Sequence, residues 1–530
     1  MSQEFLATPL ETQLDALFGQ YTAADQARGL VYGLVGPSGL VHSAGFGLAN
    51  DTGDAPDADT VFPIASMTKS FVAAGALLAR DRGLVNLDAP ITDFFPEFSA
   101  GFPGEGVGVG DSDDAPTLRM LLSMGGGLTE DNSWVDPFID MPVDELLVIV
   151  ARGLSYSTPP GSAFEYSNLG YTLAGLAVGK AVGRPIEDWV RDEILLPLGL
   201  DSTRFDNDQA FLAATRTRAT GYSLNAAGAW VGFPPVQSGA FAAAGGICST
   251  VRDLAAWVSW LGAAFRPHSA ADSGPLRRAS RREMQHIHQL TLPALATRAD
   301  GPLTLSVSGY GLGLSVREDL HRGTVVTHSG GLPGFILNMV WHPDSGHGVV
   351  VLTNSHRASP IPLSEEALFR VLDRHAVPAR TIRSWPATRD LQRRTDELIR
   401  HWDDRLADEI FAENIAFDRP LADRRDHIAG LIDQIGPLTD PRPGSTALPD
   451  LVSAATPADV TWAIPGERGE LICMIHLTPT TPARIQELEV RAAPYGTPRS
   501  ARPTDISPRR KALGVASLSS LPNTAVDWPH

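Results

Sequence analysis

The chain has 530 residues, of which 43% are hydrophobic and 20% are charged, and its formal net charge at pH 7 is −18. This composition is typical of a globular protein and excludes a fibrous or disordered chain, while the length predicts two or more domains. The negative charge argues against nucleic acid or an anionic membrane surface as a partner, because both require clustered positive charge.

The N-terminal segment lacks the features of an export signal. It has no basic start and no continuous apolar stretch, and one stripe of an amphipathic helix is instead marked by Leu10, Leu14, Leu17 and Phe18. No apolar run is long enough for a membrane span. The two cysteines, Cys248 and Cys473, lie far apart in apolar settings, which indicates buried free thiols. We therefore expect a cytoplasmic protein.

Helix and strand signals alternate unevenly along the next 350 residues. Two strands are predicted first, and a long apolar helix follows from Ser66 to about Gly83. Helices are then predicted at 117–124, 142–152, 171–182 and 186–196, and strands at 311–317, 324–328, 335–342 and 348–353. A helical centre between two strand-rich ends predicts an α+β fold, an α/β sandwich with one antiparallel sheet formed from both ends of the chain.

The most informative local pattern is Ser66-Met-Thr-Lys69 at the start of the long helix. Residues three apart share a helix face, so the hydroxyl and the amine can form a hydrogen bond. The alternative is a surface lysine in an ordinary helix, but the apolar flanks predict a buried one. Burial and the helix N-terminus both lower the pKa of the Lys69 amine, which would let it take the serine proton.

A second pattern, Tyr166-Ser-Asn168, lies in a loop just before another predicted helix. A tyrosine whose pKa is lowered by a nearby lysine can carry protons between Ser66, water and a leaving group. Asn168 can donate to a substrate carbonyl while it accepts from Lys69. Taken alone, such a triplet is usually structural.

A third pattern, His328-Ser-Gly330-Gly331, ends an apolar strand. The glycines let a ligand approach the backbone, and an edge strand would present a free N–H to it. By itself the segment is more typical of a hydrogen-bonded histidine at the end of a strand, before a glycine-rich turn.

Together and in this order, these patterns resemble the penicillin-recognising serine hydrolases over roughly residues 10–375. That group comprises class C β-lactamases, DD-peptidases and their esterase, D-aminopeptidase and thioesterase relatives. The resemblance implies a β-lactamase/transpeptidase-like antiparallel sheet with a helical subdomain. It also implies that no cofactor and no metal takes part.

The resemblance implies a role for each residue of the three patterns. Ser66 would be the nucleophile, Lys69 its base and Tyr166 the second proton carrier, which makes these three the catalytic residues. The backbone N–H groups of Ser66 and Gly331 would form the oxyanion hole. Substrate binding would fall to Asn168, His328, Gly330 and Gly331.

One departure from the β-lactamase pattern bears on the substrate. His328 stands where β-lactamases of this group usually carry lysine, and a neutral histidine attracts a carboxylate only weakly. We therefore expect a hydrolase of an amide or ester bond in a small-molecule or short-peptide acyl substrate. The alternatives are a thioesterase or acyltransferase that releases or cyclises a peptide, and a non-catalytic binding or sensor protein on the same fold.

A possible metal site elsewhere in the chain is not supported. His286-x-His288 could form half of one, yet no His-Glu-x-x-His pattern accompanies it. A solvated basic helix over residues 277–288 explains the pair better.

The chain changes character beyond the hydrolase region. We predict a β-lactamase-like domain over residues 1–378, a small α+β accessory domain over 385–496 and a disordered tail over 497–530. In the accessory domain, charged helical spacing precedes strand-like runs at 458–464, 471–477 and 485–492. This domain could cap the cleft, form a homodimer or dock a carrier protein.

Overall fold

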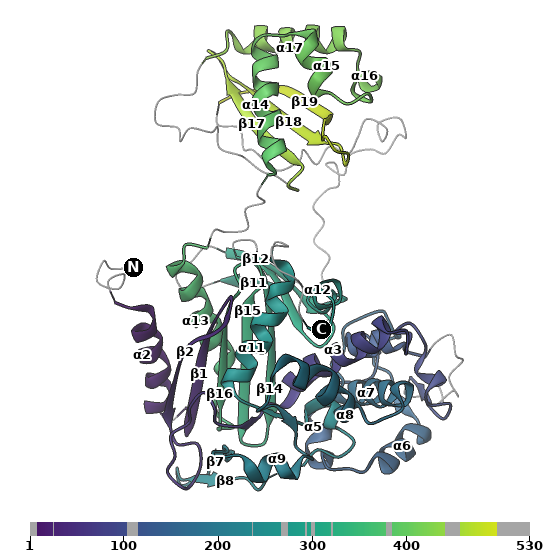
Figure 1. Ribbon diagram of the computed structural model, residues 1–530, viewed down its shortest axis with the longest axis vertical. Helices are drawn as coiled ribbons and strands as arrows, with labels where there is room; N and C mark the ends of the chain where they lie inside the picture. The colour runs from purple at the N-terminus through teal and green to yellow at the C-terminus, as the bar shows by residue number, and fades with distance from the viewer. Residues whose placement is uncertain are drawn as a thin grey trace, which may run out of the picture. The chain divides into compact units, whose positions relative to one another are not determined.

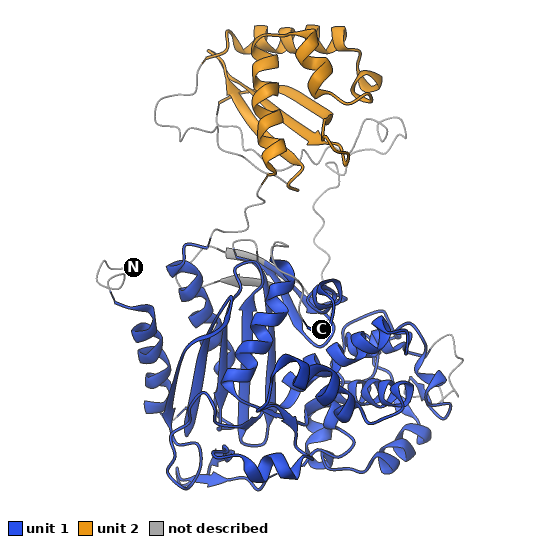
Figure 2. Cartoon of the chain, in the orientation of Figure 1, with its two compact units in different colours: residues 1–380 blue, residues 381–530 orange. Residues whose placement is uncertain are grey.

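The computed structural model describes residues 8–495, except for residues 25, 103–114, 236, 267–273, 292–293, 298–302, 320–321, 378–383 and 440–455. The predicted tail over 497–530 lies outside these residues. The chain divides into two compact units, residues 1–380 and 381–530 (Figure 2). The division falls inside the interval that the sequence leaves between its two predicted domains.

A nine-stranded antiparallel sheet forms the centre of the first unit (Figure 1). Its order is β10 (Gln289–Leu290), β12 (Leu303–Tyr310), β13 (Ser315–Asp319), β14 (Gly323–Leu332), β15 (Phe335–His342), β16 (His347–Thr353), β1 (Gly29–Gly36) and β2 (Gly39–Gly47), and β11 (Ala294–Thr297) pairs with β12. β1 pairs with β16 so that Leu30 lies opposite Thr353. The prediction of one antiparallel sheet made from both ends of the chain is therefore confirmed.

Helices cover both faces of this sheet, and β1 shows why. Every residue of β1 is buried, so successive side chains enter opposite cores. Leu30 and Tyr32 pack with α2 (Leu10–Ala23) and α13 (Pro360–Arg374). Val31 and Val35 belong to the larger core on the other face, which includes α3 (Thr68–Asp81) and α11 (Val251–Gly262). The fold is α+β, as predicted, with the sheet sandwiched between helices.

The middle of the chain forms a helical part beside the sheet (Figure 1). Its helices are α4 (Leu118–Leu122), α5 (Asn132–Val135), α6 (Val143–Arg152), α7 (Asn168–Val182), α8 (Ile186–Val190), α9 (Gln209–Ala214) and α10 (Ala242–Gly245). α7 begins three residues earlier than predicted, because the Ser167 side chain caps it by accepting from the Gly170 N–H. Short 3-10 helices, Ala65–Met67 before α3 and Asp136–Phe138 after α5, matter for the site.

The helix α12 (Arg278–Met284) corrects one expectation. The sequence predicts a solvated basic helix here, but Arg281 is 1% exposed. Its guanidinium lies over the Trp260 ring, 4.6 Å from the centroid, and donates to the Trp260 carbonyl at 2.6 Å. The arginine is an anchor of this helix, since its planar head both stacks and donates.

The second unit has its own core. Four helices, α14 (Pro386–Arg400), α15 (Asp404–Ile410), α16 (Ile415–Asp418) and α17 (Leu421–Ile435), accompany an antiparallel sheet of β17 (Asp459–Pro465), β18 (Glu470–Leu477) and β19 (Ile485–Ala493). Apolar residues of both layers, such as Leu398 and Trp462, form one cluster. The strands lie where the sequence predicts them.

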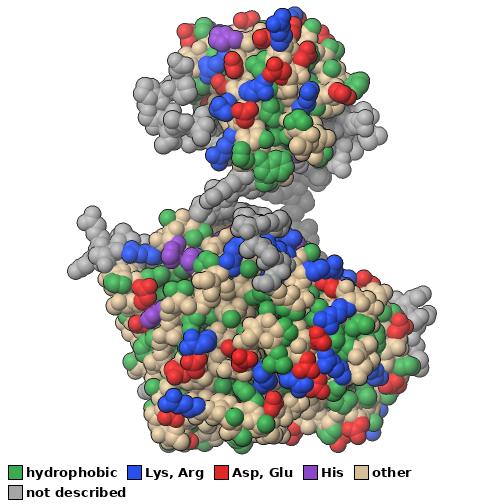
Figure 3. All heavy atoms as spheres, viewed as in Figure 1, with side chains coloured by type: hydrophobic (Ala, Val, Ile, Leu, Met, Phe, Trp, Pro, Cys, Tyr) green, Lys and Arg blue, Asp and Glu red, His purple; other side chains and the backbone are tan. Residues whose placement is uncertain are grey.

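The charged surface and the lengths of the apolar helices are relevant to nucleic acid and membranes as partners. On the face shown in Figure 3, Lys and Arg side chains are interspersed with Asp and Glu side chains on both units. Among the described residues, no helix is both long enough and apolar enough to cross a membrane.

Candidate active site

A left-handed residue places Ser66 at the head of α3. Ala65 has a φ of +49° and is buried, although it is not a glycine. Such a backbone costs on the order of 1–3 kcal/mol and persists only where the surrounding structure imposes it. Here the Ile64 N–H donates to the Ile247 carbonyl, and the 3-10 turn over Ala65–Met67 then leads into α3. Ser66 is thereby held at a helix N-terminus.

Lys69 lies directly behind Ser66 and is fully buried. Its Nζ is 3.0 Å from Ser66 Oγ, 2.7 Å from Asn168 Oδ1 and 2.8 Å from the Ala244 carbonyl oxygen. Burial lowers the pKa of the amine to about 7, and the charge of Asp131 opposes that shift. A neutral amine has two N–H donors, which the two carbonyl-type oxygens accept, so its lone pair faces the Ser66 hydroxyl. The predicted depression of this pKa is confirmed.

Tyr166 differs from what the sequence predicts. Burial raises the pKa of its phenol, the nearby carboxylates Asp131 and Glu130 raise it further, and a hydrogen bond with the Ser66 side chain opposes the shift in part. The expected lowering of the pKa by Lys69 is therefore wrong. The Lys69 amine lies 5.1 Å from the centroid of the Tyr166 ring. Tyr166 rests as a neutral phenol, and its conjugate phenolate would be a strong base.

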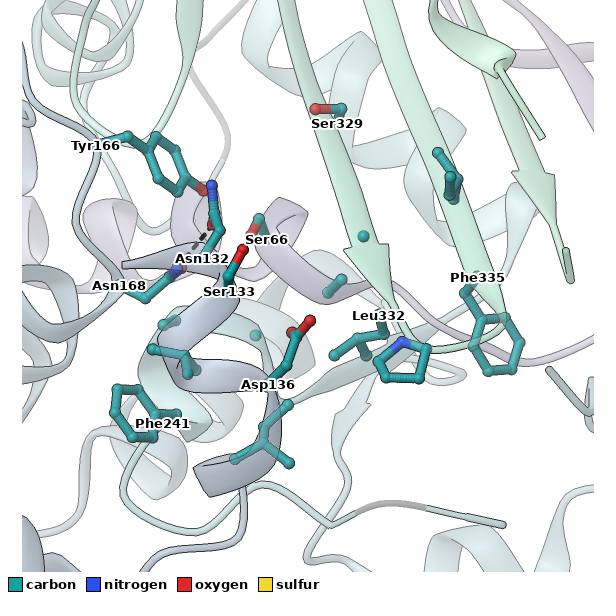
Figure 4. Close-up of a pocket in the computed structure, with 18 of the residues that line it drawn as sticks. Ser66, Asn132, Ser133, Asp136, Tyr166, Asn168, Phe241, Ser329, Leu332 and Phe335 are labelled. Atoms are coloured by element: carbon teal, nitrogen blue, oxygen red, sulfur yellow. Dashed lines mark hydrogen bonds between the residues drawn. The ribbon is translucent and has the colours of Figure 1, made fainter. Parts of the chain in front are cut away.

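Asn168 is held from two sides. Its Oδ1 accepts from Lys69, as predicted, and its Nδ2 donates to Asp131 Oδ1 at 3.0 Å. Nδ2 also donates to Asn132 Oδ1 at 2.9 Å (Figure 4). Both amide hydrogens are therefore occupied inside the protein. A substrate carbonyl can receive one of them when the exposed Asn132 side chain gives up its bond.

Asp131 is a residue of the candidate site that the sequence does not reveal. Its buried carboxylate accepts from the backbone N–H groups of Asn168 and Leu169, both at 2.7 Å, from Asn168 Nδ2, and from the Ser167 hydroxyl at 3.1 Å. These bonds place a negative charge at the N-terminus of α7, where the helix dipole favours it. They also fix the orientation of Asn168 toward Lys69.

The end of β14 provides the backbone facing Ser66. β13 pairs with β14 only up to Thr327, so the edge from His328 onward is not covered by another described strand. Leu332 and Phe335 close a two-residue hairpin, and alternation along an antiparallel strand then directs the Gly331 N–H to the free edge. A Cβ at Gly330 would lie 2.3 Å from the Ile64 carbonyl oxygen, whereas one at Gly331 would meet nothing within 4 Å. Gly330 permits the close approach, and Gly331 faces open space.

His328 is 3% exposed and both of its ring nitrogens are engaged. Nδ1 lies 2.7 Å from the Ser329 carbonyl oxygen, which can only accept, so Nδ1 carries the hydrogen. Nε2 then accepts from the Tyr310 hydroxyl at 2.8 Å. Burial and the nearby charge of Lys69 lower the pKa of His328 to about 3. The histidine is therefore neutral and offers no positive charge to a substrate.

These residues open onto one pocket of about 420 Å³ (Figure 4). Ser66, Tyr166, Asn168, His328 and Gly331 line it, so the structure brings all but two of the predicted site residues to its surface. Lys69 lies behind Ser66, and Gly330 packs against Ile64. The sequence missed other lining side chains, among them Asn132, Ser133, Asp136, Phe241, Leu332, Phe335 and His356. Among the described residues, no group of three or more His, Cys, Asp or Glu side chains could hold a metal ion.

Comparisons with known proteins show what the chain is similar to. A family model described as Beta-lactamase matches residues 14–368. Penicillin-binding protein 4* of Bacillus subtilis is 25% identical over 360 residues, which cover 64% of this chain and 71% of that protein. A D-aminopeptidase of Cereibacter sphaeroides is 26% identical over 385 residues, which cover 71% of this chain but 65%, less than two thirds, of that enzyme.

Solved structures share the fold. The octameric penicillin-binding protein homologue from Pyrococcus abyssi aligns with a TM-score of 0.58 and 18% identity, covering 91% of this chain and 98% of that one. An identity this low supports the fold alone. The family model covers well over half of the 530 residues. The chain therefore belongs to the beta-lactamase family of serine hydrolases.

Proposed function

We propose that the protein cleaves an amide or ester bond through an acyl-Ser66 intermediate. The observation that carries the proposal is the environment of Lys69, whose lone pair faces Ser66 Oγ at 3.0 Å and whose pKa is lowered to about 7. An amine with a pKa near the working pH is well matched to general-base chemistry.

The acylation step follows from this arrangement. Lys69 takes the Ser66 proton as Oγ attacks the substrate carbonyl carbon. The tetrahedral oxyanion lies between the N–H groups of Ser66 and Gly331, where one such donor is worth on the order of 10²–10³ in rate. The carbonyl re-forms, the bond to the leaving group breaks, and Tyr166 gives its proton to the leaving group.

Deacylation reverses the roles of the same groups. The Tyr166 phenolate takes a proton from water, and the resulting hydroxide attacks the acyl carbon. When the oxyanion collapses, the bond from the acyl carbon to Ser66 Oγ breaks and Oγ recovers its proton from Lys69. The raised pKa of Tyr166 favours this step, because a weaker acid has a stronger conjugate base.

The charge of the pocket limits the class of substrate that fits it. None of the described lining residues is a lysine or arginine, and His328 is neutral, so a β-lactam carboxylate would find no cation there. A peptidase, amidase or esterase substrate fits this pocket better. The similarity to D-aminopeptidase supports an amide substrate.

The test combines labelling with turnover. We expect a fluorophosphonate to add one label to the wild type, and p-nitrophenyl esters or D-amino-acid p-nitroanilides to be hydrolysed, with both activities absent from Ser66→Ala. An added amine or alcohol nucleophile would reveal acyl transfer as a second product. If neither label nor turnover occurs with any of these probes, the proposal fails and a non-catalytic binding protein on this fold becomes the better account.

A further inference from the structure

We propose that Asp136 makes the pocket selective for an acyl group that carries a protonated amine. The inference rests on the proposed function, because it concerns the substrate of the Ser66 site. Asp136 begins the 3-10 helix Asp136–Phe138, directly after α5, and its side chain lines the pocket.

The charges around the pocket favour a cation. Asp136 is the one carboxylate among the described lining residues, and no lysine or arginine lines the pocket. Lys69 is buried behind Ser66, where its amine is engaged by three oxygens. The lining histidines are His328, which is neutral, and His356, which forms no ion pair with Asp136 although its charge acts on that carboxyl.

Asp136 differs from Asp131, five residues earlier, in that its carboxylate is free. Asp131 accepts four hydrogen bonds, whereas no described residue donates to the Asp136 carboxylate or forms an ion pair with it. Asp136 is an exposed residue, yet desolvation of its carboxyl by the surrounding protein raises its pKa, and the charge of His356 opposes that shift. A carboxylate that is partly desolvated without a partner is stabilised by a bound ammonium.

The view into the pocket indicates which part of the substrate carries the amine. In Figure 4, Asp136 extends toward the space between Ser66 and Leu332, and Ser133, from the same segment, lies beside Ser66. Tyr166 lies on the other side of Ser66. In the proposed reaction Tyr166 protonates the leaving group. The acyl part therefore extends toward Asp136, and the apolar side chains of Leu332 and Phe335 provide a wall for its hydrocarbon portion.

The experiment measures binding to Ser66→Ala, which cannot turn substrate over. The ligands are p-nitroanilides of ω-amino acids of increasing chain length, each matched with the alkyl anilide in which a methyl replaces the ammonium. We expect at least one ammonium ligand to bind about tenfold tighter than its match. On the same background, Asp136→Asn should bring the ratio close to one. The control is Asp140→Asn, which changes an exposed aspartate outside the pocket lining and should leave the affinity ratio unchanged.

A charge-reversal variant distinguishes the loss of the carboxylate from the loss of the folded structure. Asp136→Lys should favour the matching dicarboxylic acid monoanilide over the ammonium ligand, and an inverted preference cannot arise from unfolding. The proposal is overturned if the ratio is already close to one with Asp136 present, or if it survives Asp136→Asn.

The two proposals can fail separately. Labelling and ester turnover at Ser66 without any ammonium preference would remove the role of Asp136 and leave the hydrolase intact. An ammonium preference that depends on Asp136, without labelling or turnover, would remove the hydrolase and leave a receptor for cationic ligands.

Discussion

The two walls of the pocket are built in opposite ways. The inner wall presents Ser66, Tyr166 and Asn168 to the pocket, and Lys69 and Asp131 lie behind it. This group of residues is largely buried and connected by hydrogen bonds. The outer wall, residues 132–139, is mostly exposed, and its Asp136 carboxylate has no partner among the described residues. In the proposed reaction, packing holds the catalytic groups in place, whereas a short surface segment selects the substrate. Changes to the inner wall should therefore alter rate and stability, and changes to the outer wall should alter selectivity.

The largest expected effect is at Lys69. Lys69→Ala should lower kcat/KM for a p-nitrophenyl ester by about 10³-fold, because Ser66 loses its base. Lys69→Arg should not restore activity, since a guanidinium does not give up its proton. Lys180→Ala, which changes a lysine that donates to the Phe94 carbonyl at an exposed site, is the matched control. Near-normal turnover by the arginine variant would show that a neutral amine is not required.

A smaller effect is expected where β14 meets the Ser66 segment. Gly330→Ala would place a Cβ 2.3 Å from the Ile64 carbonyl oxygen, so the strand or the Ser66 turn must shift. We expect a loss of about 1–3 kcal/mol in the free energy of unfolding, measured by thermal denaturation, and about 10²-fold lower kcat/KM. Gly331→Ala meets nothing within 4 Å and should keep the wild-type Tm. Equal Tm values for the two variants would contradict this packing.

Asp131→Asn should lower the stability moderately and shift the pH dependence of kcat/KM in a direction that the structure predicts. Two backbone N–H groups lose a charged acceptor, which we expect to cost about 2–3 kcal/mol of stability. The charge of Asp131 raises the pKa of Lys69, so its removal lowers that pKa. Activity requires the neutral amine and is lost as pH falls through its pKa. The acid limb of the kcat/KM profile should thus move to lower pH in Asp131→Asn. In the control variant Asp140→Asn it should stay in place. A move to higher pH in Asp131→Asn would refute the electrostatic coupling between Asp131 and Lys69.

The smallest expected effect is at Tyr310. Tyr310→Phe keeps the ring that packs against Tyr166 but leaves His328 Nε2 without its donor. We expect about 1 kcal/mol lower stability by chemical denaturation and less than a tenfold change in kcat/KM. A loss of 10²-fold or more would place the Tyr310 hydroxyl in the chemistry itself.

The local part of the site was predictable from the sequence. Ser66 and Lys69 are three residues apart, and one turn of helix brings them together whatever the rest of the fold does. The strands β14 to β16 carry apolar patterns that a sheet requires. The helix α11 is not among the predicted elements, although Val251–Gly262 is amphipathic, with Arg252 and Ser259 seven residues apart on one face.

The tertiary part was not predictable. Asp131 meets Asn168 across 37 residues of sequence, and no spacing rule connects a loop aspartate to a distant helix N-terminus. The direction of the Tyr166 pKa depends on burial and on the Asp131 carboxylate, which outweigh the lysine that the sequence places nearby. The lack of a partner for the Asp136 carboxylate likewise depends on tertiary structure, because no side chain among the described residues lies close enough to donate to it.

The most direct test of the central claim is the pre-steady-state burst of p-nitrophenolate from an activated ester, followed by stopped flow between about pH 5 and 9. We predict a burst of one equivalent per active site whose rate rises with pH through a pKa of about 7, as Lys69 becomes neutral, and which is absent from Ser66→Ala. A burst that persists in Ser66→Ala, or a burst rate that does not change across this pH range, would contradict a Ser66 nucleophile activated by a neutral Lys69.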